Sequence, residues 1–397
     1  MFSQRVMEHL AGSSGIRAMF EEGAQLKKIY GAENVFDFSI GNPDPEPPAE
    51  TKEALKKFVL EDKPGLHWYM SNAGYADVRA KIAADLNKRN GSSTLSGDNI
   101  VMTVGAGGGL NVILKSLLNP GEEVIVFSPF FVEYGFYIDN HGGKMVVIET
   151  DPETFQPDLD VLEQSITPRT KAILINSPHN PTGVIYSEEK LRAMALLMEA
   201  KEREYGTTIF LISDEPYRDI VYDGATVPSV LAIFKNSLIG YSYSKSLSLP
   251  GERIGYVAAN NMIENIDALM DALIFANRSL GFVNAPSLFQ KVVGESLDAK
   301  VDVGIYQERR DMLYNHLIEC GFDCIKPGGA FYLFPKCPIP DVMEFKNRAL
   351  KHNIILVPGT GFGSSKHFRL AYCCSVETIK KSLPAFTALA KEVGIKK

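Results

Sequence analysis

Short apolar runs alternate with longer amphipathic stretches between about residues 75 and 290. The apolar runs predict strands at Asn99–Val104, Glu123–Phe127, Lys144–Ile148, Ala172–Asn176, Thr208–Ile212, Ser237–Tyr241 and Arg253–Ala259. The stretches around them predict helices at Tyr75–Lys88, Gly109–Leu117, Asp158–Gln164, Ser187–Glu204 and Met262–Asn277. This alternation is typical of an α/β fold with a mostly parallel, seven-stranded sheet between helices.

The last hundred residues follow a different pattern. A turn and strand across residues 328–334 and strands at Ile354–Val357 and Phe368–Ala371 lie among helices at Gly304–Glu319, Asp341–Lys351 and Val376–Val393. We interpret this part as a smaller α+β domain, and we expect the N-terminal helix at Gly15–Tyr30 to pack against it. The chain exceeds the length at which one core usually stops growing. We therefore expect a large domain of residues 50–290 and a small domain of residues 1–49 and 291–397.

The composition narrows the classes of function. The net charge is −7 and no basic tract stands out, so nucleic acid is not an expected partner. Because no apolar run reaches the length of a membrane span and the start lacks a secretory pattern, we expect a cytoplasmic protein that does not bind membranes. The five cysteines form no C-x-x-C pair and the seven histidines show no H-E-x-x-H spacing, so neither a disulfide framework nor a metal site is expected.

Glycine-rich or polar segments follow several expected strands, and ligands of parallel α/β sheets bind at that edge. The first is Gly105-Ala106-Gly107, whose backbone could close on a phosphate at a helix N-terminus. A tight turn without a ligand explains these glycines equally well. A dinucleotide-binding loop is a weaker alternative, because Leu110 stands where the last glycine of that motif belongs.

Three later strand ends carry further candidates. Phe131 could stack on a flat heteroaromatic ring, although core packing also explains it. Asn180 lies in a proline-rich loop that is either a ligand contact or a plain turn. Asp214 directly follows an apolar run, so we expect its carboxylate to be buried. A buried carboxylate needs a partner, which could be a protonated ring nitrogen, a cation in a salt bridge or the end of a helix.

The fifth segment contains Ser242, Ser244 and Lys245, with Arg253 eight positions after the lysine. An amine beside hydroxyl groups and a guanidinium suggests an anion and an amine chemistry held together, as in a pyridoxal phosphate (PLP) site. An exposed, charged loop explains this segment alone equally well. All of these segments are expected at one edge of the sheet, and no single structural explanation covers the set.

In this order, the motifs resemble those of the class I/II PLP-dependent aminotransferases of fold type I, the aspartate aminotransferase superfamily, over nearly the whole chain. The resemblance implies that Lys245 binds pyridoxal 5'-phosphate covalently and later acts as the base, that Asp214 keeps the ring nitrogen protonated, and that Phe131 stacks on the ring. It places Tyr217 and Asn180 at the phenolic oxygen of the ring. It assigns the phosphate to Gly105, Ala106, Gly107, Ser242, Ser244 and Arg253.

The same resemblance implies how the substrate is bound. Arg369 matches the arginine that takes the α-carboxylate, with Asn180 and the backbone of Gly41 beside it. Tyr69 matches a tyrosine that reaches the phosphate of the neighbouring subunit, which implies a homodimer with shared active sites.

The implied activity is ping-pong transamination of an α-amino acid with a 2-oxo acid through pyridoxamine phosphate, with aspartate or alanine and 2-oxoglutarate as the expected pairing. A PLP-dependent β-lyase of the same fold would share every cofactor residue, and a nicotinamide-dependent dehydrogenase or a catalytically silent PLP-binding protein are alternatives of other classes. The glycine loop, with three consecutive glycines at 107–109, lacks the polar side chain that many relatives carry there. Arg278 or Arg17 could read a distal carboxylate, although both are equally explained as solvated charges at helix ends.

Overall fold

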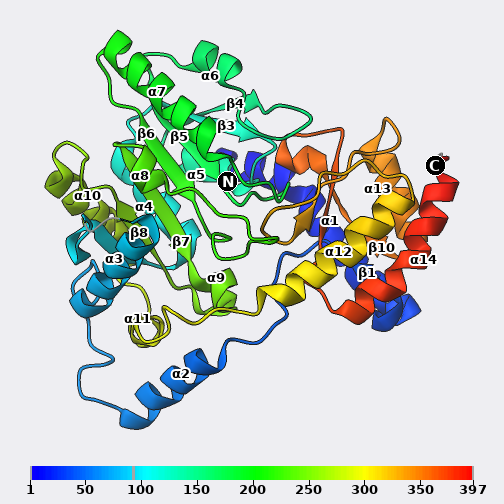
Figure 1. Cartoon of the computed structure of the whole chain (residues 1–397), viewed down its shortest axis with the longest axis horizontal. Helices are drawn as coiled ribbons and strands as arrows, with labels where there is room; N and C mark the ends of the chain where they lie inside the picture. Colours follow the sequence, from blue (N-terminus) through cyan, green and yellow to red (C-terminus); the bar gives the residue numbers. More distant parts are fainter. Residues whose placement is uncertain (1, 92–93, 396–397) are drawn as a thin grey trace.

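The computed structural model describes residues 2–91 and 94–395, without the side chains of residues 11–22 and 24. A seven-stranded sheet in the order β2-β8-β7-β6-β5-β3-β4 forms the larger part of the molecule (Figure 1). Its strands are β2 (Ile100–Thr103), β3 (Glu123–Ser128), β4 (Lys144–Glu149), β5 (Thr170–Asn176), β6 (Phe210–Asp214), β7 (Ser237–Ser242) and β8 (Gly255–Ala259). Neighbours from β4 across to β7 run parallel, whereas β8 is antiparallel to both β7 and β2. The predicted α/β fold is confirmed.

Alternate residues of each central strand contribute to two separate hydrophobic cores. In β3, Val124 and Val126 belong to one core, and Ile125 and Phe127 belong to the other. This two-residue period puts a helical layer on each face of the sheet. One layer contains α4 (Gly105–Leu117), α5 (Glu133–Asn140) and α10 (Ile266–Ser279). The other contains α3 (Ala76–Asn90), α6 (Leu159–Ser165), α7 (Glu188–Tyr205), α8 (Val230–Ile233) and α11 (Ser287–Gly294).

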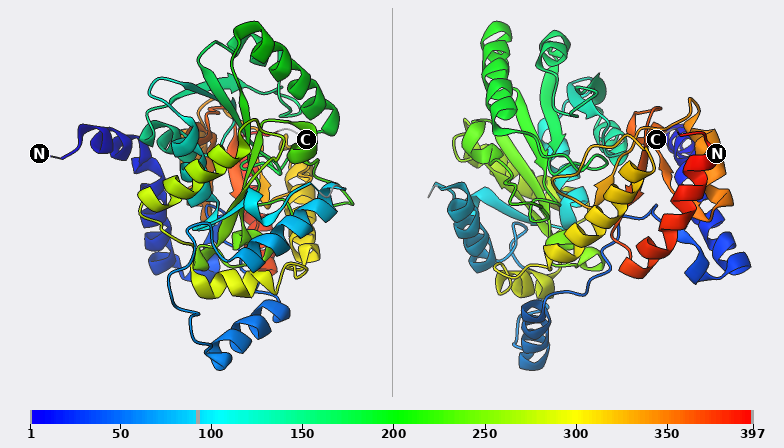
Figure 2. Two further views of the ribbon diagram at one scale, coloured as in Figure 1. Left: turned by 90° about the vertical axis from the view of Figure 1, so that its left-hand side faces the viewer. Right: turned by 45° about the vertical axis from the view of Figure 1, so that its right-hand side comes forward.

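A smaller unit with its own core lies to one side of the large sheet (Figure 2). It contains helices α12 (Val303–Glu319), α13 (Val342–Lys351) and α14 (Val376–Glu392), and a three-stranded sheet of β11 (Val357–Pro358), β12 (Phe368–Ala371) and β9 (Tyr332–Leu333). The N-terminal segment joins it, because β1 (Phe36–Asp37) pairs in parallel with β10 (Ile354–Ile355). The exact domain boundaries at residues 50 and 290 stay a prediction.

The element boundaries differ from the expected ones where they affect the site. Helix α4 begins at Gly105 rather than Gly109, so the glycines form its first turn instead of a preceding loop. Strand β6 continues through Asp214, which pairs with Asn176 of β5. Helix α1 (Gln4–Tyr30) begins eleven residues before the expected helix, as the bounds 4 and 15 show. Helices α2 (Ala49–Glu61), α5, α8, α9 (Tyr243–Ser246) and α11 lie where the sequence pattern predicts none.

The length and the polarity of each helix decide whether it could cross a membrane. Among the described residues, none of the helices is long and apolar enough to cross a membrane.

Candidate active site

The carboxyl ends of the central strands meet the smaller unit at a cavity of about 420 Å³. Most of the site residues expected from the sequence line this cavity: Gly41, Ala106, Gly107, Phe131, Asn180, Asp214, Tyr217, Ser242, Ser244, Lys245, Arg253 and Arg369. They come from segments up to 328 positions apart (369 − 41), so only the tertiary fold brings them together. The structure therefore builds one polar site from the separate candidates.

Lys245 lies on α9, the short helix that directly follows β7. Ser242, the last residue of β7, begins this helix, because its hydroxyl accepts a hydrogen bond from the backbone N–H of Ser244. The Lys245 Nζ atom donates to the carbonyl oxygen of Gly41 at 2.7 Å. The pKa of the Lys245 amine is lowered to about 8, mainly by burial; the effect of Cys373 opposes this shift, and the charges of Arg253 and Arg369 add to it. A substantial fraction of this amine is therefore neutral near physiological pH.

Asp214 is buried at the end of β6 with one carboxylate oxygen in use and one free. Its Oδ2 atom accepts a hydrogen bond from the Tyr134 hydroxyl at 2.7 Å, and its Oδ1 atom has no hydrogen-bond partner among the described residues. Burial raises the pKa of the carboxyl to about 7, although the bond from Tyr134 opposes this shift. A buried oxygen without a partner is costly, so the site is built for a donor that occupies the cavity.

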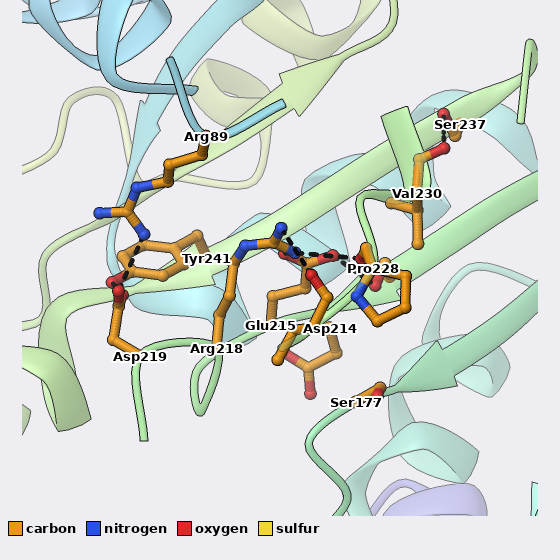
Figure 3. Close-up of polar contacts among 12 residues, drawn as sticks. Arg89, Ser177, Asp214, Glu215, Arg218, Asp219, Pro228, Val230, Ser237 and Tyr241 are labelled. Atoms are coloured by element: carbon orange, nitrogen blue, oxygen red, sulfur yellow. Dashed lines mark hydrogen bonds and ion pairs between the residues drawn. The ribbon is translucent and has the colours of Figure 1, made fainter. Parts of the chain in front are cut away.

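Charged pairs behind the cavity hold this strand end in place (Figure 3). Arg218 donates to Glu215 at 2.8 Å, next to Asp214. Further along, Arg89 pairs with Asp219 at 2.9 Å, and Asp219 accepts a hydrogen bond from the Tyr241 hydroxyl at 2.6 Å. These contacts connect the segment after β6 with β7, the strand that leads to the lysine helix.

The first turn of α4 forms an anion cradle together with Arg253. In the part of the chain that the structure describes, no side chain caps this helix, so its first N–H groups are available to an anion. Gly105 has φ +77°, and a Cβ built there would lie 2.7 Å from Arg253 Nη2, so glycine is required for the arginine to approach. The hydroxyl oxygens of Ser242 and Ser244 lie 2.6 Å apart on the same cavity. The arrangement suits a phosphate group.

Arg369, in strand β12 of the smaller unit, also lines the cavity. It donates to the Asn180 side-chain oxygen at 3.2 Å and to the Ser39 carbonyl at 2.6 Å, and its Nε atom has no partner among the described residues. The rings of Tyr332 and Phe362 lie 4.7 and 4.8 Å from the guanidinium carbon. These contacts fix a planar donor that suits a carboxylate.

The phenolic-oxygen candidates form a connected group. Because Arg369 uses the Asn180 Oδ1 atom, the amide nitrogen of Asn180 stays available as a donor. The Tyr217 hydroxyl lies 2.7 Å from the Tyr332 hydroxyl. Tyr332 and Tyr134 were not expected at the site from the sequence. The spacing of Tyr134, three residues after Phe131 at the start of a helix, could have indicated it.

Tyr69 and Arg278 do not line the cavity, as judged from the described residues. Tyr69 is 91% exposed and borders a separate hollow with Phe282 and Asn284. Arg278 lies exposed in the last turn of α10, with its guanidinium carbon 5.5 Å from the ring centre of Phe275. The side chain of Arg17 lies outside the described residues. A role for Tyr69 needs a second subunit and stays a prediction.

Comparison with known proteins identifies the class that this fold and site define. The family model for aminotransferase class I and II matches residues 33–386, so the chain belongs to that family. A crystal structure of an amino transferase from Eubacterium rectale is 41% identical, with a TM-score of 0.96 over 99% of this chain and 100% of that one. The aspartate/prephenate aminotransferase of Thermus thermophilus is 34% identical over 88% of this chain and 89% of its own length. A probable N-acetyl-LL-diaminopimelate aminotransferase of Bacillus subtilis is 30% identical over 95% of both chains.

The chain is therefore an aminotransferase whose cofactor is pyridoxal phosphate. The residues present fit this cofactor. The unpartnered Asp214 Oδ1 atom matches a protonated ring nitrogen, the uncapped turn of α4 with Arg253 matches the phosphate, and the buried Lys245 amine matches the aldehyde.

Proposed function

We propose that this aminotransferase transfers the amino group of an α-amino acid to a 2-oxo acid, with Lys245, Asp214 and Arg369 in the central roles. The observation that carries the proposal is the arrangement of a buried amine, an unpartnered carboxylate oxygen and a fixed guanidinium around one cavity. When bound, PLP supplies an electron sink for negative charge at the substrate α-carbon.

The protein residues would divide the remaining work. Arg369 binds the α-carboxylate and so orients the α-carbon. Lys245, neutral in part near physiological pH, would serve as the base that accepts the proton from the substrate α-carbon and as the acid that later gives it up. Asp214 holds the proton on the ring nitrogen, and its burial strengthens that interaction.

For the substrates, the family resemblance favours aspartate or alanine with 2-oxoglutarate. Relatives described as aspartate aminotransferases support the aspartate pairing, among them that of Thermotoga maritima at 31% identity over 96% of this chain. The cavity supports alanine more strongly. Among the described residues, the cations that line it are Lys245, Arg253 and Arg369, and each already has a proposed partner.

We further propose a homodimer located in the cytoplasm. The side chains of Trp68 and Tyr69 are 73% and 91% exposed. Large aromatic side chains that a dimer interface covers are exposed in this way when one chain is considered alone. The five cysteines are all free, as is typical of a reducing compartment.

Half-reactions test the transamination proposal. The holoenzyme is mixed with single amino acids in the absence of a 2-oxo acid, and the absorbance of the cofactor and the release of ammonia are followed. We expect conversion to the amino form of the cofactor without ammonia, and recovery on addition of a 2-oxo acid. Stoichiometric ammonia release would indicate a β-lyase and contradict the proposal.

A further inference from the structure

The wall of the cavity formed by α5 contains a carboxylate that the proposed reaction does not use. Glu133, the first residue of this helix, lines the cavity and is half-buried. Among the described residues, no donor forms a hydrogen bond to the Glu133 carboxylate and no cation pairs with it. Burial raises the pKa of the Glu133 carboxyl. Its natural partner is therefore a group that enters the cavity.

The cavity wall beside Glu133 is polar, and the described cations that line the cavity are those already given to the cofactor and the α-carboxylate. Tyr137 lies four residues later on the same face of α5 and also lines the cavity. A Cβ built on Gly107 would lie 3.0 Å from the Tyr137 hydroxyl oxygen, so the glycine leaves room for that hydroxyl. The wall thus presents a carboxylate and a phenolic oxygen, both of which can accept hydrogen bonds.

A purely structural role for Glu133 is the alternative. A glutamate in the first turn of a helix stabilises the helix dipole by about 0.3–1 kcal/mol. Glu189 has that position in α7 and is exposed to solvent, as expected for this role alone. Glu133 faces the cavity instead, where a bound substrate would exclude water from it and raise the cost of leaving it unpaired.

We propose that Glu133 is a specificity-determining residue that selects amino donors whose side chain ends in a protonated nitrogen. L-Lysine and L-ornithine represent this class. A donor with a second carboxylate would bring two like charges together in the cavity, which is unfavourable. The inference rests on the proposed transamination, and it names a donor class that differs from the alanine and aspartate favoured by the family resemblance.

Matched donors test the inference in the holoenzyme. L-Norleucine has the carbon skeleton of L-lysine without the terminal nitrogen, so the ratio of their kcat/KM values isolates that group. We expect L-lysine to be preferred by about 10- to 100-fold, as a charge-assisted hydrogen bond provides. In Glu133→Gln the ratio should fall to within about threefold of unity, since the amide lacks the charge. The kcat/KM for L-aspartate should rise in the same variant.

Glu189→Gln is the matched control, because it removes a first-turn glutamate outside the cavity and should leave the ratio unchanged. Equilibrium binding of 6-aminohexanoate and hexanoate, which differ only in the terminal nitrogen and carry no α-amino group, gives a second measurement independent of turnover. Wild-type protein should bind the amine-bearing compound at least about tenfold more tightly, and Glu133→Gln should not.

The outcomes separate the inference from the proposed function. Conversion of the cofactor by L-norleucine and L-lysine at equal kcat/KM, or an unchanged ratio in Glu133→Gln, contradicts the inference alone. If no amino donor converts the cofactor, the proposed function is contradicted. The binding of 6-aminohexanoate compared with hexanoate then decides whether Glu133 binds a cationic ligand.

Discussion

The reactivity of Lys245 follows from its burial. A lowered pKa means that the neutral, nucleophilic amine forms at lower pH than for an ordinary lysine, whose pKa is about 10.4. With a pKa of about 8, the rate at which the cofactor-free protein binds PLP covalently should rise with pH and reach half its maximum near pH 8. Stopped-flow absorbance across pH 6–11 measures this rate. A midpoint near that of an ordinary lysine would contradict the assigned environment.

Asp214 provides a second prediction at the level of residues. Asp214→Asn keeps the shape of the side chain but removes the charge that holds the ring proton, so kcat/KM should fall by at least about 100-fold, or about 3 kcal/mol. Tyr134→Phe is the matched control, because it removes only the hydrogen bond to Oδ2 and should cost about tenfold. Steady-state kinetics with one donor measure both. Equal losses in the two variants would refute the role of Asp214.

Arg369 provides a third prediction at the level of residues. Arg369→Lys keeps the positive charge but loses the planar, two-pronged donor, so KM for the amino acid should rise by about 10- to 100-fold while the cofactor spectrum stays the same. An unchanged KM would place the α-carboxylate elsewhere. Steady-state titration of the donor is the measurement.

Sequence reasoning found the residues whose chemistry is marked locally and missed those defined by contacts across the fold. Lys245 and Asp214 stand directly at strand ends, which is a pattern of the chain itself. Tyr332 reaches Tyr217 across 115 positions, and Tyr134 reaches Asp214 across 80, so neither contact can be derived from neighbouring residues, although the spacing of Tyr134 from Phe131 marks Tyr134 itself as a candidate. The role of Tyr69 depends on a second chain and stays a prediction.

At the level of elements, the start of α4 tests the anion cradle. Gly105→Ala forces a side chain onto a positive φ angle and into Arg253, whereas Gly121→Ala meets the same φ strain with open space around it. Both should lower stability by about 1 kcal/mol, but only Gly105→Ala should weaken PLP binding, by about tenfold or more. Thermal melts and PLP titration measure the two effects. Equal PLP affinities would argue against a phosphate at this helix.

Elements with a strong apolar period were predictable, and those whose pattern depends on their surroundings were not. All seven strands of the large sheet were expected within about two residues of their ends, because each is a short apolar run, and all but the edge strand β4 are buried along almost their whole length. Helix α2 has few buried positions, and α5 reads as an aromatic run after a strand, so neither shows a helical period. The glycine-rich start of α4 also hides a helix, since glycine has low helix propensity.

At the level of the whole molecule, a shared active site can be tested by complementation. In a hybrid dimer of Tyr69→Ala and Lys245→Ala subunits, one site would contain both Lys245 and the other subunit's Tyr69. Co-expression of the two inactive variants should therefore restore up to roughly a quarter of wild-type activity, if subunits pair at random. Activity no greater than the sum of the separate variants would contradict the shared site.

The central claim is that Lys245 is the covalent anchor of PLP in a transaminating site. The most direct measurement is borohydride reduction of the holoenzyme followed by peptide mass spectrometry. We predict that the reduced cofactor is found on the peptide that contains Lys245, and that Lys245→Ala is neither labelled there nor able to transaminate. Labelling of a different lysine, or a Lys245→Ala variant that transaminates at the wild-type rate, would contradict the account.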